Sequence, residues 1–348
     1  MSTKAALRNA LDRHPNEPLS HLPTPIDALK RWPESTIDVD IRIKRDDCTG
    51  LAMGGNKSRQ LSYYIGDAIS KGCDTLLSTG AVQSNYMRIL AAAAAKCGLQ
   101  CHIQLEDRVD NRSSDYQRSG NVLLDHLFGA TIHYYAEGED EDGADSALAV
   151  LAEDLTGKGR RPYIIPLGGD HKPTGALGYV EAALELIDQF EGMNWSPDVI
   201  VVGSGSGLTH SGLLCGLRLA GSSIPVLGAC VRRPVVDQFP RIKRHTQRLQ
   251  QMLDMDAIVA DSDILLDDRA LAPGYGLQSD LVVHAIRDMA TMEGILLDPV
   301  YSGKTCAVLY DQIKRKEIGE GSRCLIMHTG GTPAIFAYRE KMQQIADL

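Results

Sequence analysis

The sequence predicts an α/β protein, and three observations support this fold class. Short apolar runs rich in β-branched residues alternate along the chain with longer segments whose apolar residues recur at the helical period. Glycine-rich turns stand at several points where an apolar run passes into a helical segment. Alternation of this kind is typical of parallel strands joined by crossover helices.

Eight short apolar segments are expected to form strands, because they are rich in residues that favour β structure and are bounded by turn residues. They cover residues 41–44, 75–78, 101–105, 131–135, 163–165, 199–202, 225–229 and 324–327. The clearest helices between them cover residues 84–96, 174–190, 209–220 and 277–293, each with Ser or Thr near its N-terminal end. No linker rich in Pro, Gly or Ser divides the chain, so any two lobes must share contacts.

The composition is that of an ordinary globular protein and excludes some classes of function. With 348 residues, 43% hydrophobic and 23% charged, the chain can bury one large core or two smaller ones around a cleft. A net charge of -9 and the lack of a Lys/Arg cluster argue against nucleic acid as a partner. No apolar run approaches the roughly 20 residues that span a membrane, and no signal-peptide core is present, so a cytoplasmic location is expected.

The eight cysteines are scattered through apolar contexts, without the dense spacing of a disulfide framework, so reduced thiols are expected. Cys97 and Cys101 have a spacing that a metal ion could use. No second pair of Cys or His follows them, so packing is favoured and no metal is expected. The acidic stretch at residues 137–145 is interpreted as a solvated loop, because its like charges repel.

Lys57 is the first candidate for chemistry. It follows Gly54, Gly55 and Asn56, and a helical pattern begins at this point. The helix dipole disfavours a positive charge at a helix N-terminus, which lowers the pKa of the amine and suits a lysine that forms an imine. The alternative is a surface lysine in a glycine turn.

Two further segments are suited to bind anions. In residues 78–88, Gln83, Ser84 and Asn85 open an Ala-rich helix and offer backbone N–H groups and a hydroxyl to a carboxylate; the alternative is an N-cap by Ser84 alone. In residues 201–213, a buried strand enters a Gly-Ser loop before the next helix. This loop predicts a phosphate site made of backbone amides, without the Lys of a P-loop or the GxGxxG spacing of a dinucleotide site, and a turn without ligand is the alternative.

Tyr275 and Tyr301 lie in glycine and proline turns of the C-terminal third, ahead of the motif HTGGTP at residues 328–333. Tyrosines held in this way are candidate proton donors or acceptors. Taken singly, each is more simply explained as a core aromatic whose hydroxyl has a hydrogen-bond partner.

Six motifs together resemble one known family. They are LPTP at residues 22–25, IKRDD at 43–47, GGNK at 54–57, GAVQSN at 80–85, GALGY at 175–179 and HTGGTPA at 328–334. In this order they are similar to the pyridoxal-phosphate (PLP) enzymes of fold type II, in the group of D-cysteine desulfhydrase and 1-aminocyclopropane-1-carboxylate (ACC) deaminase. The resemblance spans roughly residues 22–336 and is nearer to D-cysteine desulfhydrase.

The resemblance implies two open parallel-sheet domains with PLP in the cleft between them. The large, PLP-binding domain would consist of residues 1–57 and 170–348. The small domain, residues 58–169, would carry the loop for the substrate carboxylate. A small amino acid is the expected substrate, and a homodimer is usual in the family.

Carried over residue by residue, the resemblance implies a role for each motif. Lys57 would bind PLP as a Schiff base, and Asn85 would contact the ring hydroxyl. The other cofactor contacts would come from Asn56, Ser302, Thr329 and the phosphate loop of Gly205, Ser206, Gly207, Leu208 and Thr209. The substrate carboxylate would bind at Gln83, Ser84, Asn85 and Tyr86, and the groups acting at the reacting carbons would be Tyr275, Tyr301 and Ser84.

Four residues depart from the family pattern. Tyr86 stands where His or Gln is common, and Leu208 replaces a glycine of the phosphate loop. His171 and Lys172 interrupt a run of small residues before Gly175.

Ser302 guides the choice among reactions. The ACC deaminase pattern has a glutamate at this position, which faces the pyridine nitrogen of PLP and keeps it protonated. A neutral hydroxyl leaves that nitrogen largely unprotonated, which favours rapid loss of a β-leaving group over a long-lived carbanion. The resemblance therefore predicts β-elimination, with D-cysteine converted to pyruvate, sulfide and ammonia.

Three alternatives stay open. Removal of sulfite from L-cysteate would need a cationic pocket, to which His171 and Lys172 could contribute. Ring-opening of ACC is disfavoured by Ser302. A PLP-binding or amino-acid-binding protein without turnover is disfavoured by Lys57 and the two tyrosines, because simple binding needs no imine-forming amine.

Overall fold

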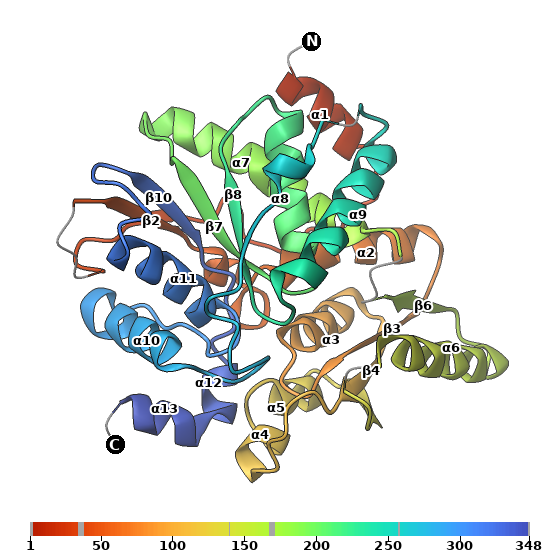
Figure 1. Ribbon diagram of the computed structural model, residues 1–348. Helices are drawn as coiled ribbons and strands as arrows, with labels where there is room; N and C mark the ends of the chain where they lie inside the picture. The colour runs from red at the N-terminus through yellow and green to blue at the C-terminus, as the bar shows by residue number, and fades with distance from the viewer. Residues whose placement is uncertain (1–2, 34–37, 139, 167–170, 257, 347–348) are drawn as a thin grey trace.

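The computed structural model describes residues 3–33, 38–138, 140–166, 171–256 and 258–346, and it contains two open sheets covered by helices (Figure 1). The prediction of an α/β fold is confirmed. The larger sheet has the strand order β1-β2-β10-β7-β8-β9, and the smaller sheet has the order β5-β4-β3-β6. Neighbouring strands run parallel except β1 and β2, which pair antiparallel at the edge of the larger sheet.

All eight expected strands are present. In the larger sheet they are β2 (Asp40–Lys44), β7 (Val199–Ser204), β8 (Val226–Cys230) and β10 (Arg323–Met327). In the smaller sheet they are β3 (Thr75–Ala81), β4 (Gln100–Glu106), β5 (Thr131–Tyr135) and β6 (Pro162–Ile165). The sequence did not indicate β1 (Ile26–Ala28) or β9 (Leu265–Asp267), because strands of three residues are too short for a periodic signal.

The four expected helices are also confirmed, as α3 (Asn85–Cys97), α7 (Leu177–Met193), α8 (Leu208–Leu219) and α10 (Asp280–Glu293). The other α-helices of the described residues are α1 (Thr3–Leu11), α2 (Lys57–Ser70), α4 (Ser114–Arg118), α5 (Gly120–Leu127), α6 (Glu141–Gly157), α9 (Val235–Leu253), α11 (Ser302–Lys314), α12 (Ala334–Ala337) and α13 (Arg339–Ile345). Short 3-10 turns are η1 (Asp46–Cys48), η2 (Leu51–Met53), η3 (Thr174–Ala176) and η4 (Asp261–Asp263). Nowhere in the described residues is a helix long and apolar enough to cross a membrane.

The described part of the acidic stretch at residues 137–145 is not simply the solvated loop that was expected. Asp140 accepts a hydrogen bond from the backbone N–H of Gly143 at 2.9 Å and caps α6, which begins at Glu141. Acidic side chains are favourable in the first turn of a helix, because the dipole is positive there. The stretch is therefore a helix start, and its charges match the helix dipole.

Strand β3, one of the two inner strands of the smaller sheet, is buried along its whole length. On β3, Leu76 belongs to the core that α3 helps to form, and Leu77 belongs to a second core with α6. Successive side chains of a strand point to opposite faces, so helices cover both faces of this sheet. The covered strand then delivers Gly80 and Ala81 to the carboxyl edge of the sheet.

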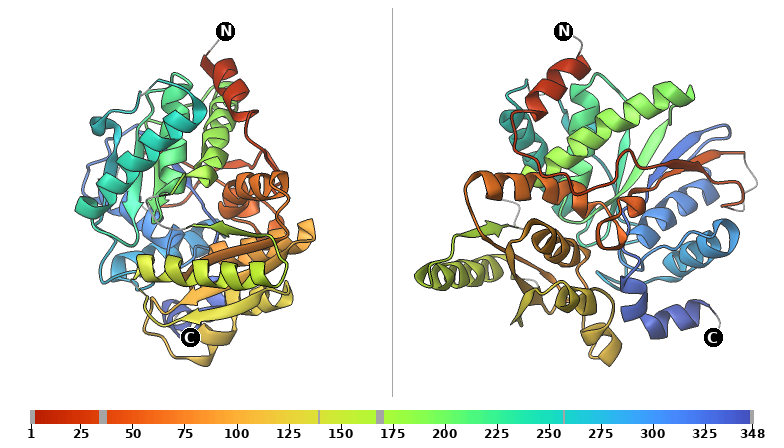
Figure 2. Two further views of the ribbon diagram at one scale, coloured as in Figure 1. Left: turned by 90° about the vertical axis from the view of Figure 1, so that its right-hand side faces the viewer. Right: turned by 180° about the vertical axis from the view of Figure 1, so that it is seen from behind.

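The two sheets belong to two lobes that share contacts (Figure 2). The strands of the smaller sheet all lie within residues 58–169, the segment predicted as the small domain, and those of the larger sheet lie outside it. The domain boundaries themselves stay a prediction. Helix α2 packs on α3 of the small lobe and on α7 of the large lobe, and the C-terminal α12 returns to pack on α4 and α5.

A buried group of charged side chains fixes the start of α2. Asp46 of η1 is fully buried, and its carboxylate accepts hydrogen bonds from Arg59 Nη2 at 3.0 Å, from Arg59 Nε at 3.1 Å and from the Tyr179 hydroxyl at 2.5 Å. Arg59 also donates to both oxygens of Glu185 on α7, each at 2.9 Å. Since Lys57 lies two residues before Arg59 in the same helix, this network sets the position of Lys57.

Removal of the central carboxylate tests the network. Asp46→Ala leaves Arg59 and the buried Lys44 without one of their counter-charges, and we expect it to lower the free energy of unfolding by about 3–5 kcal/mol. Asp154→Ala removes an exposed i,i+4 ion pair with Lys158 and should lower it by only about 0.3–0.5 kcal/mol. Denaturant unfolding followed by circular dichroism measures both losses. Equal losses in the two variants would show that the network does not hold the fold.

Candidate active site

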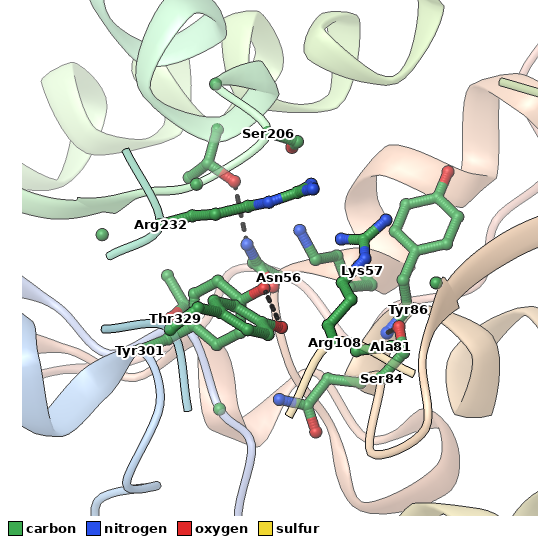
Figure 3. Close-up of a pocket in the computed structure, with 18 of the residues that line it drawn as sticks. Asn56, Lys57, Ala81, Ser84, Tyr86, Arg108, Ser206, Arg232, Tyr301 and Thr329 are labelled. Carbon is green, nitrogen blue, oxygen red and sulfur yellow. Dashed lines mark hydrogen bonds between the residues drawn. The ribbon is translucent and has the colours of Figure 1, made fainter. Parts of the chain in front are cut away.

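A cavity lies between the two lobes, at the carboxyl ends of strands from both sheets (Figure 3). Its walls come from the turns that follow β3, β4, β7, β8 and β10 and from the first residues of α2 and α3. This edge is where α/β sheets present their ligands. The predicted site residues that line the cavity are Asn56, Lys57, Ser84, Asn85, Tyr86, Gly205, Ser206, Gly207, Thr209, Tyr275, Tyr301 and Thr329.

Lys57 is the first residue of α2, as the sequence predicted, and its side chain is half-buried. Its Nζ lies 3.5 Å from Gln60 Oε1 and 5.5 Å from the centroid of the Tyr86 ring. Burial lowers the pKa of Lys57 to about 8. The predicted direction of the shift is therefore confirmed, and burial is a cause that the sequence could not show.

Another lysine with a lowered pKa shows why geometry must accompany the pKa. Burial also lowers the pKa of Lys304 on α11 to about 8. Its Nζ, however, donates to the backbone oxygens of Leu271 and Gly274, both at 2.7 Å. Lys304 therefore holds the turn ahead of Tyr275, whereas Lys57 directs its amine into the cavity.

The glycine loop between β7 and α8 is held from outside by α9. The backbone oxygen of Gly205 accepts a hydrogen bond from Gln238 Nε2 at 3.1 Å, and that of Ser206 accepts one from Arg241 Nε at 2.8 Å. Gly207 has φ +96°, a conformation that side chains other than glycine rarely adopt, and it is the N-cap of α8. The carbonyl groups of Gly205 and Ser206 thus face α9, and the loop lines the cavity at a helix N-terminus, where backbone N–H groups can bind an anion.

Thr209 is the second residue of α8 and is oriented by two amides. Its Oγ1 accepts hydrogen bonds from Asn56 Nδ2 and from Gln60 Nε2, both at 2.8 Å. The hydroxyl proton is therefore left to donate into the cavity that Thr209 lines. The backbone N–H of Asn56 in turn donates to the backbone oxygen of Thr329 at 3.1 Å, which joins the lysine turn to the C-terminal motif.

Ser84 is the N-cap of α3, and its Oγ accepts from the backbone N–H groups of Tyr86 and Met87 at 3.2 and 3.3 Å. Ser84 therefore caps α3, as this segment of the sequence indicated. Ser84 also lines the cavity, together with Asn85 and Tyr86, so the N-terminal end of α3 faces the cavity as well. A second anion can therefore bind at this helix end.

Asn85 is held through its side-chain oxygen. Asn85 Oδ1 accepts hydrogen bonds from Arg88 Nη1 and from Asn121 Nδ2, both at 3.1 Å, which leaves its NH2 group to face the cavity. Arg88 is fully buried, and its Nη2 donates to the backbone oxygen of Gly54 at 2.8 Å. Arg88 therefore joins the start of α3 to the glycine turn ahead of Lys57.

The two predicted tyrosines meet in the cavity. The hydroxyls of Tyr275 and Tyr301 are 3.0 Å apart, and the rings lie edge to face with centroids 6.1 Å apart. Burial and the neighbouring Tyr275 raise the pKa of Tyr301, while the positive charge of Arg108 acts in the opposite direction. Two hydroxyls that share a hydrogen bond in the cavity that Lys57 also lines can pass a proton, which neither tyrosine alone would indicate.

Two predicted residues, Gln83 and Leu208, do not line the cavity. Gln83 points into the small lobe, where its Nε2 donates to the backbone oxygens of Tyr116 and Ser119 at 2.6 and 3.0 Å. Leu208 is buried in a core of apolar side chains from several helices. Both side chains therefore pack outside the cavity, next to residues that line it.

Ser302 does not line the cavity either. It is buried at the first position of α11, and its hydroxyl donates to Asp298 Oδ1 at 2.6 Å. The same oxygen of Ser302 accepts a hydrogen bond from the backbone N–H of Asp298 at 2.7 Å. The hydroxyl is therefore engaged with its own helix start, and this geometry gives no support to a contact with the pyridine nitrogen.

His171 and Lys172 also lie away from the cavity. They border a separate, smaller hollow beside Leu208 and His245. The His171 ring is exposed, with its Nε2 at 3.3 Å from Asp145 Oδ2. A cationic site for substrate must therefore come from other residues.

Sequence reasoning missed three arginines that line the cavity: Arg108, Arg232 and Arg241. Arg108 follows β4 and Arg232 follows β8, so both stand just after the carboxyl end of a parallel strand. That position is a signal which could have identified them. Arg241 lies within α9 and reaches back to the glycine loop, a contact that no local pattern marks.

Glu141 of the small lobe is the partner of the large-lobe arginines. Its Oε1 accepts from Arg232 Nη1 at 2.7 Å and from Arg233, and its Oε2 accepts from Arg241 Nη1 at 3.3 Å. Burial alone would raise the pKa of Glu141, but the three arginines hold that pKa below its ordinary value. The contact ties the two lobes together at the edge of the cavity.

Comparison with known proteins agrees with this geometry. The family model described as pyridoxal-phosphate dependent enzyme matches residues 18–330. The D-cysteine desulfhydrases of Salmonella typhi and Salmonella paratyphi B are each 42% identical over 328 residues. Those residues make up 94% of this chain and 97% of each relative.

Solved structures have the same fold. The crystal structure of an ACC deaminase homologue is 35% identical, with a TM-score of 0.87 over 98% of this chain and 99% of its own. O-ureido-L-serine synthase is 19% identical, with a TM-score of 0.67 over 95% of this chain and 94% of its own, which shows the fold alone. Since the family match covers most of the chain and relatives at 42% identity cover nearly all of it, this chain belongs to the family of pyridoxal-phosphate-dependent enzymes.

Proposed function

We propose that this chain catalyses β-elimination on a small amino acid with PLP as its cofactor, and that D-cysteine is a substrate, converted to pyruvate, sulfide and ammonia. The observation that carries the proposal is one cavity that is lined by a lysine amine with a lowered pKa, a glycine loop at a helix N-terminus and a hydrogen-bonded tyrosine pair. The Salmonella relatives, which are D-cysteine desulfhydrases at 42% identity, support the choice of substrate.

The phosphate of PLP fits the glycine loop. The N–H groups of residues 205–209 and the N-terminal end of α8 would hold it, and Thr209 would donate its hydroxyl proton. A Cβ added at Gly205 would lie 3.1 Å from Tyr301 Cε1, and one added at Gly207 would lie 3.0 Å from Ile242 Cδ1. The loop therefore has little room for side chains, which brings its backbone close to a ligand.

The ring of PLP fits the opposite end of the cavity. Asn85 would donate from its NH2 group to the ring hydroxyl, because its oxygen already accepts from Arg88 and Asn121. Asn56 and Thr329, which are joined through their backbones, would complete the contacts. Lys57 would bind the cofactor covalently from the start of α2.

Lys57 is the group placed to move the substrate proton. PLP, when bound, supplies an electron sink that acidifies the hydrogen on the α-carbon of the substrate. With a pKa of about 8, roughly a tenth of the Lys57 amine is neutral at pH 7. At the ordinary pKa of 10.5, only about one part in three thousand would be neutral. Burial thus makes Lys57 a usable base once the substrate has displaced it.

The substrate would be oriented by the start of α3. Its carboxylate would bind at Ser84, Asn85 and the backbone of Tyr86, where the helix dipole favours a negative charge. The tyrosine pair would face the β-carbon. Tyr301 would donate a proton to the leaving group, and the hydrogen bond with Tyr275 would assist that transfer.

The ranking of β-elimination above ring-opening of ACC rests on the relatives rather than on Ser302. The Ser302 hydroxyl is engaged with Asp298 and does not line the cavity, so the proposal places no weight on a contact between Ser302 and the pyridine nitrogen. Binding without turnover is disfavoured, because the cavity contains a lysine amine with a lowered pKa and a hydrogen-bonded pair of hydroxyls, which binding alone does not require.

Two parts of the proposal concern the protein as a whole. The family resemblance favours a homodimer, and a cytoplasmic location is proposed with it. Light scattering on the purified protein measures the oligomeric state, and cell fractionation measures the location.

A substrate panel tests the function. We expect the purified holoenzyme to release pyruvate and sulfide from D-cysteine and pyruvate from β-chloro-D-alanine, with much slower turnover of L-cysteine and ACC. Lys57→Ala should abolish turnover, and borohydride should no longer fix cofactor to the peptide that contains residue 57. Lys304, which has the same lowered pKa, should carry no cofactor in wild type. Release of 2-oxobutyrate from ACC without pyruvate from D-cysteine would refute the proposal.

The lowered pKa of Lys57 predicts a pH dependence of cofactor capture. The neutral amine is the nucleophile, so capture of PLP by apoprotein should accelerate about tenfold per pH unit below pH 8. It should level off above about pH 8, because the pKa of Lys57 is about 8 instead of its ordinary 10.5. Stopped-flow absorbance measures this rate. A rate that still climbs at pH 10 would mean that burial does not depress the pKa of this amine.

The tyrosine pair predicts a loss of rate without a loss of cofactor. Tyr301→Phe and Tyr275→Phe each break the shared hydrogen bond, and we expect turnover of D-cysteine to fall about 100-fold while PLP is retained. Tyr134→Phe, at an exposed tyrosine of β5, is the matched control and should leave turnover unchanged. Steady-state rates and cofactor content per chain measure the outcome. Full turnover in Tyr301→Phe would remove the tyrosines from the chemistry.

A further inference from the structure

Arg88 on α3 is a fully buried cation whose hydrogen bonds all go to neutral oxygens. Its Nη1 donates to Asn85 Oδ1 at 3.1 Å and to Asn121 Oδ1 at 2.8 Å, and its Nη2 donates to the backbone oxygen of Gly54 at 2.8 Å. Burial lowers the pKa of Arg88 to about 10, so the guanidinium is still charged at pH 7. A buried charge without a counter-charge is costly, so a partner for Arg88 is to be expected.

Two acidic residues act on Arg88 through space, but neither forms a hydrogen bond with it in the part of the chain that the structure describes. Asp298 is engaged at the start of α11, where it accepts from three backbone N–H groups and from the Ser302 hydroxyl. Asp125 on α5 is fully buried, and no described residue binds either of its carboxylate oxygens. Burial raises the pKa of Asp125 to about 8 against the effect of Arg88, so this acid is mostly neutral at pH 7.

Asn85 connects the charge of Arg88 to the cavity. Its Oδ1 accepts from Arg88, and its NH2 group is left to face the cavity that Asn85 lines. The amide packs beside Gly331, where an added Cβ would lie 2.9 Å from Asn85 Nδ2, so a side chain there would displace it. Hydrogen bonds in a chain polarise one another, and a charged donor at one end makes the group at the other end a stronger donor. The NH2 group of Asn85 is therefore suited to an acceptor that carries negative charge.

We propose that Arg88 is a positioning residue for the cofactor, and that the negatively charged ring oxygen of bound PLP is its counter-charge, reached through the Asn85 amide. This inference rests on the proposed function, because it takes PLP to be the cofactor and Asn85 to contact the ring oxygen. The ring of PLP is electron-poor, which favours loss of the proton from its ring hydroxyl. Since Arg88 also holds Gly54 in the turn ahead of Lys57, one side chain orients both the ring and the lysine that binds it.

Two cofactors test the inference: PLP, and its 3-deoxy analogue, which keeps the aldehyde and the phosphate but has no ring hydroxyl. The PLP preference is the Kd of the analogue divided by the Kd of PLP, both measured by absorbance titration of the full-length apoprotein. In Arg88→Gln we expect the PLP preference to fall about 10-fold, because the Asn85 amide remains but a charged donor no longer polarises it. Intrinsic differences between the two compounds are the same for every variant, so they cancel in this comparison.

Asn85→Ala shows whether Arg88 acts through the amide. It should lower the PLP preference at least as much as Arg88→Gln does. Adding Arg88→Gln to Asn85→Ala should lower the preference by less than about threefold more, because the effects of residues that act through one contact are not additive. Additive losses would overturn the relay. Arg112→Gln, at an exposed arginine of the small lobe, is the matched control and should leave both Kd values unchanged.

Asp125 provides a second test, which leaves Arg88 in place. Above pH 8, Asp125 ionises and supplies Arg88 with a counter-charge, so wild type should lose PLP preference, whereas Asp125→Asn cannot ionise. The PLP preference of wild type divided by that of Asp125→Asn should therefore fall about threefold or more between pH 7 and pH 9. The Cys101 thiol, which also faces Asp125, has its pKa raised to about 12 by burial and stays neutral in this range. Titration of Lys57 affects both cofactors alike and cancels.

A quotient well below one already at pH 7 would mean that Asp125 is the counter-charge of Arg88, and it would overturn the inference. A quotient of one that does not fall by pH 9 would also overturn it, because a charge beside Arg88 would then not reach the ring oxygen.

The outcomes separate this inference from the proposed function. An unchanged PLP preference in Arg88→Gln, in an enzyme that turns over D-cysteine, would overturn the inference and leave β-elimination standing. An equal loss of affinity for both cofactors would overturn it as well, since Arg88 would then only hold the fold. A PLP preference that depends on Arg88, in an enzyme that does not turn over D-cysteine, would support the inference and overturn the proposed reaction.

Discussion

The buried ion pair between Asp46 and Arg59 is the contact on which the site depends. Charges taken out of water need partners within reach, and here Asp46 comes from the turn after β2, Arg59 from α2, and Glu185 and Tyr179 from α7. These three segments supply one another's buried hydrogen-bond partners in the observed arrangement. That arrangement fixes the first turn of α2, and with it the amine of Lys57, against the large lobe.

A second set of buried charges makes the cavity cationic in a chain whose net charge is -9. Arg108 is held by Glu106, while Arg232 and Arg241 share Glu141 across the two lobes. Each carboxylate orients its arginine without covering it from the cavity. The site thus concentrates positive charge where PLP and amino-acid substrates carry negative charge, and the acidic surface elsewhere does not oppose this, because exposed charges are screened over about 10 Å.

Much of the fold and of the site followed from local patterns. The sequence signal for each expected strand and helix is local, because it consists of the spacing of apolar residues within the element and of the turn residues at its ends. The same logic placed Lys57 at a helix start and identified Ser84 as an N-cap. It failed for Glu141, where a run of like charges suggested a loop although the first turn of a helix accepts acidic residues. The role of Ser302 came from the resemblance instead, and a resemblance does not reveal that the Ser302 hydroxyl donates to Asp298.

The sequence by itself therefore determined the α/β class, the order of the elements and the turns that could hold an amine, a phosphate and a carboxylate. These properties depend on neighbouring residues, so they can be recognised along the chain. Only the tertiary structure decided which charged side chains enter the cavity. Arg241 meets Ser206 across 35 residues and Arg232 meets Glu141 across 91, and such partners are chosen by the packing of the lobes. The pKa of Lys57 was decided in the same way, because desolvation depends on everything that surrounds the amine and not on its neighbours in sequence.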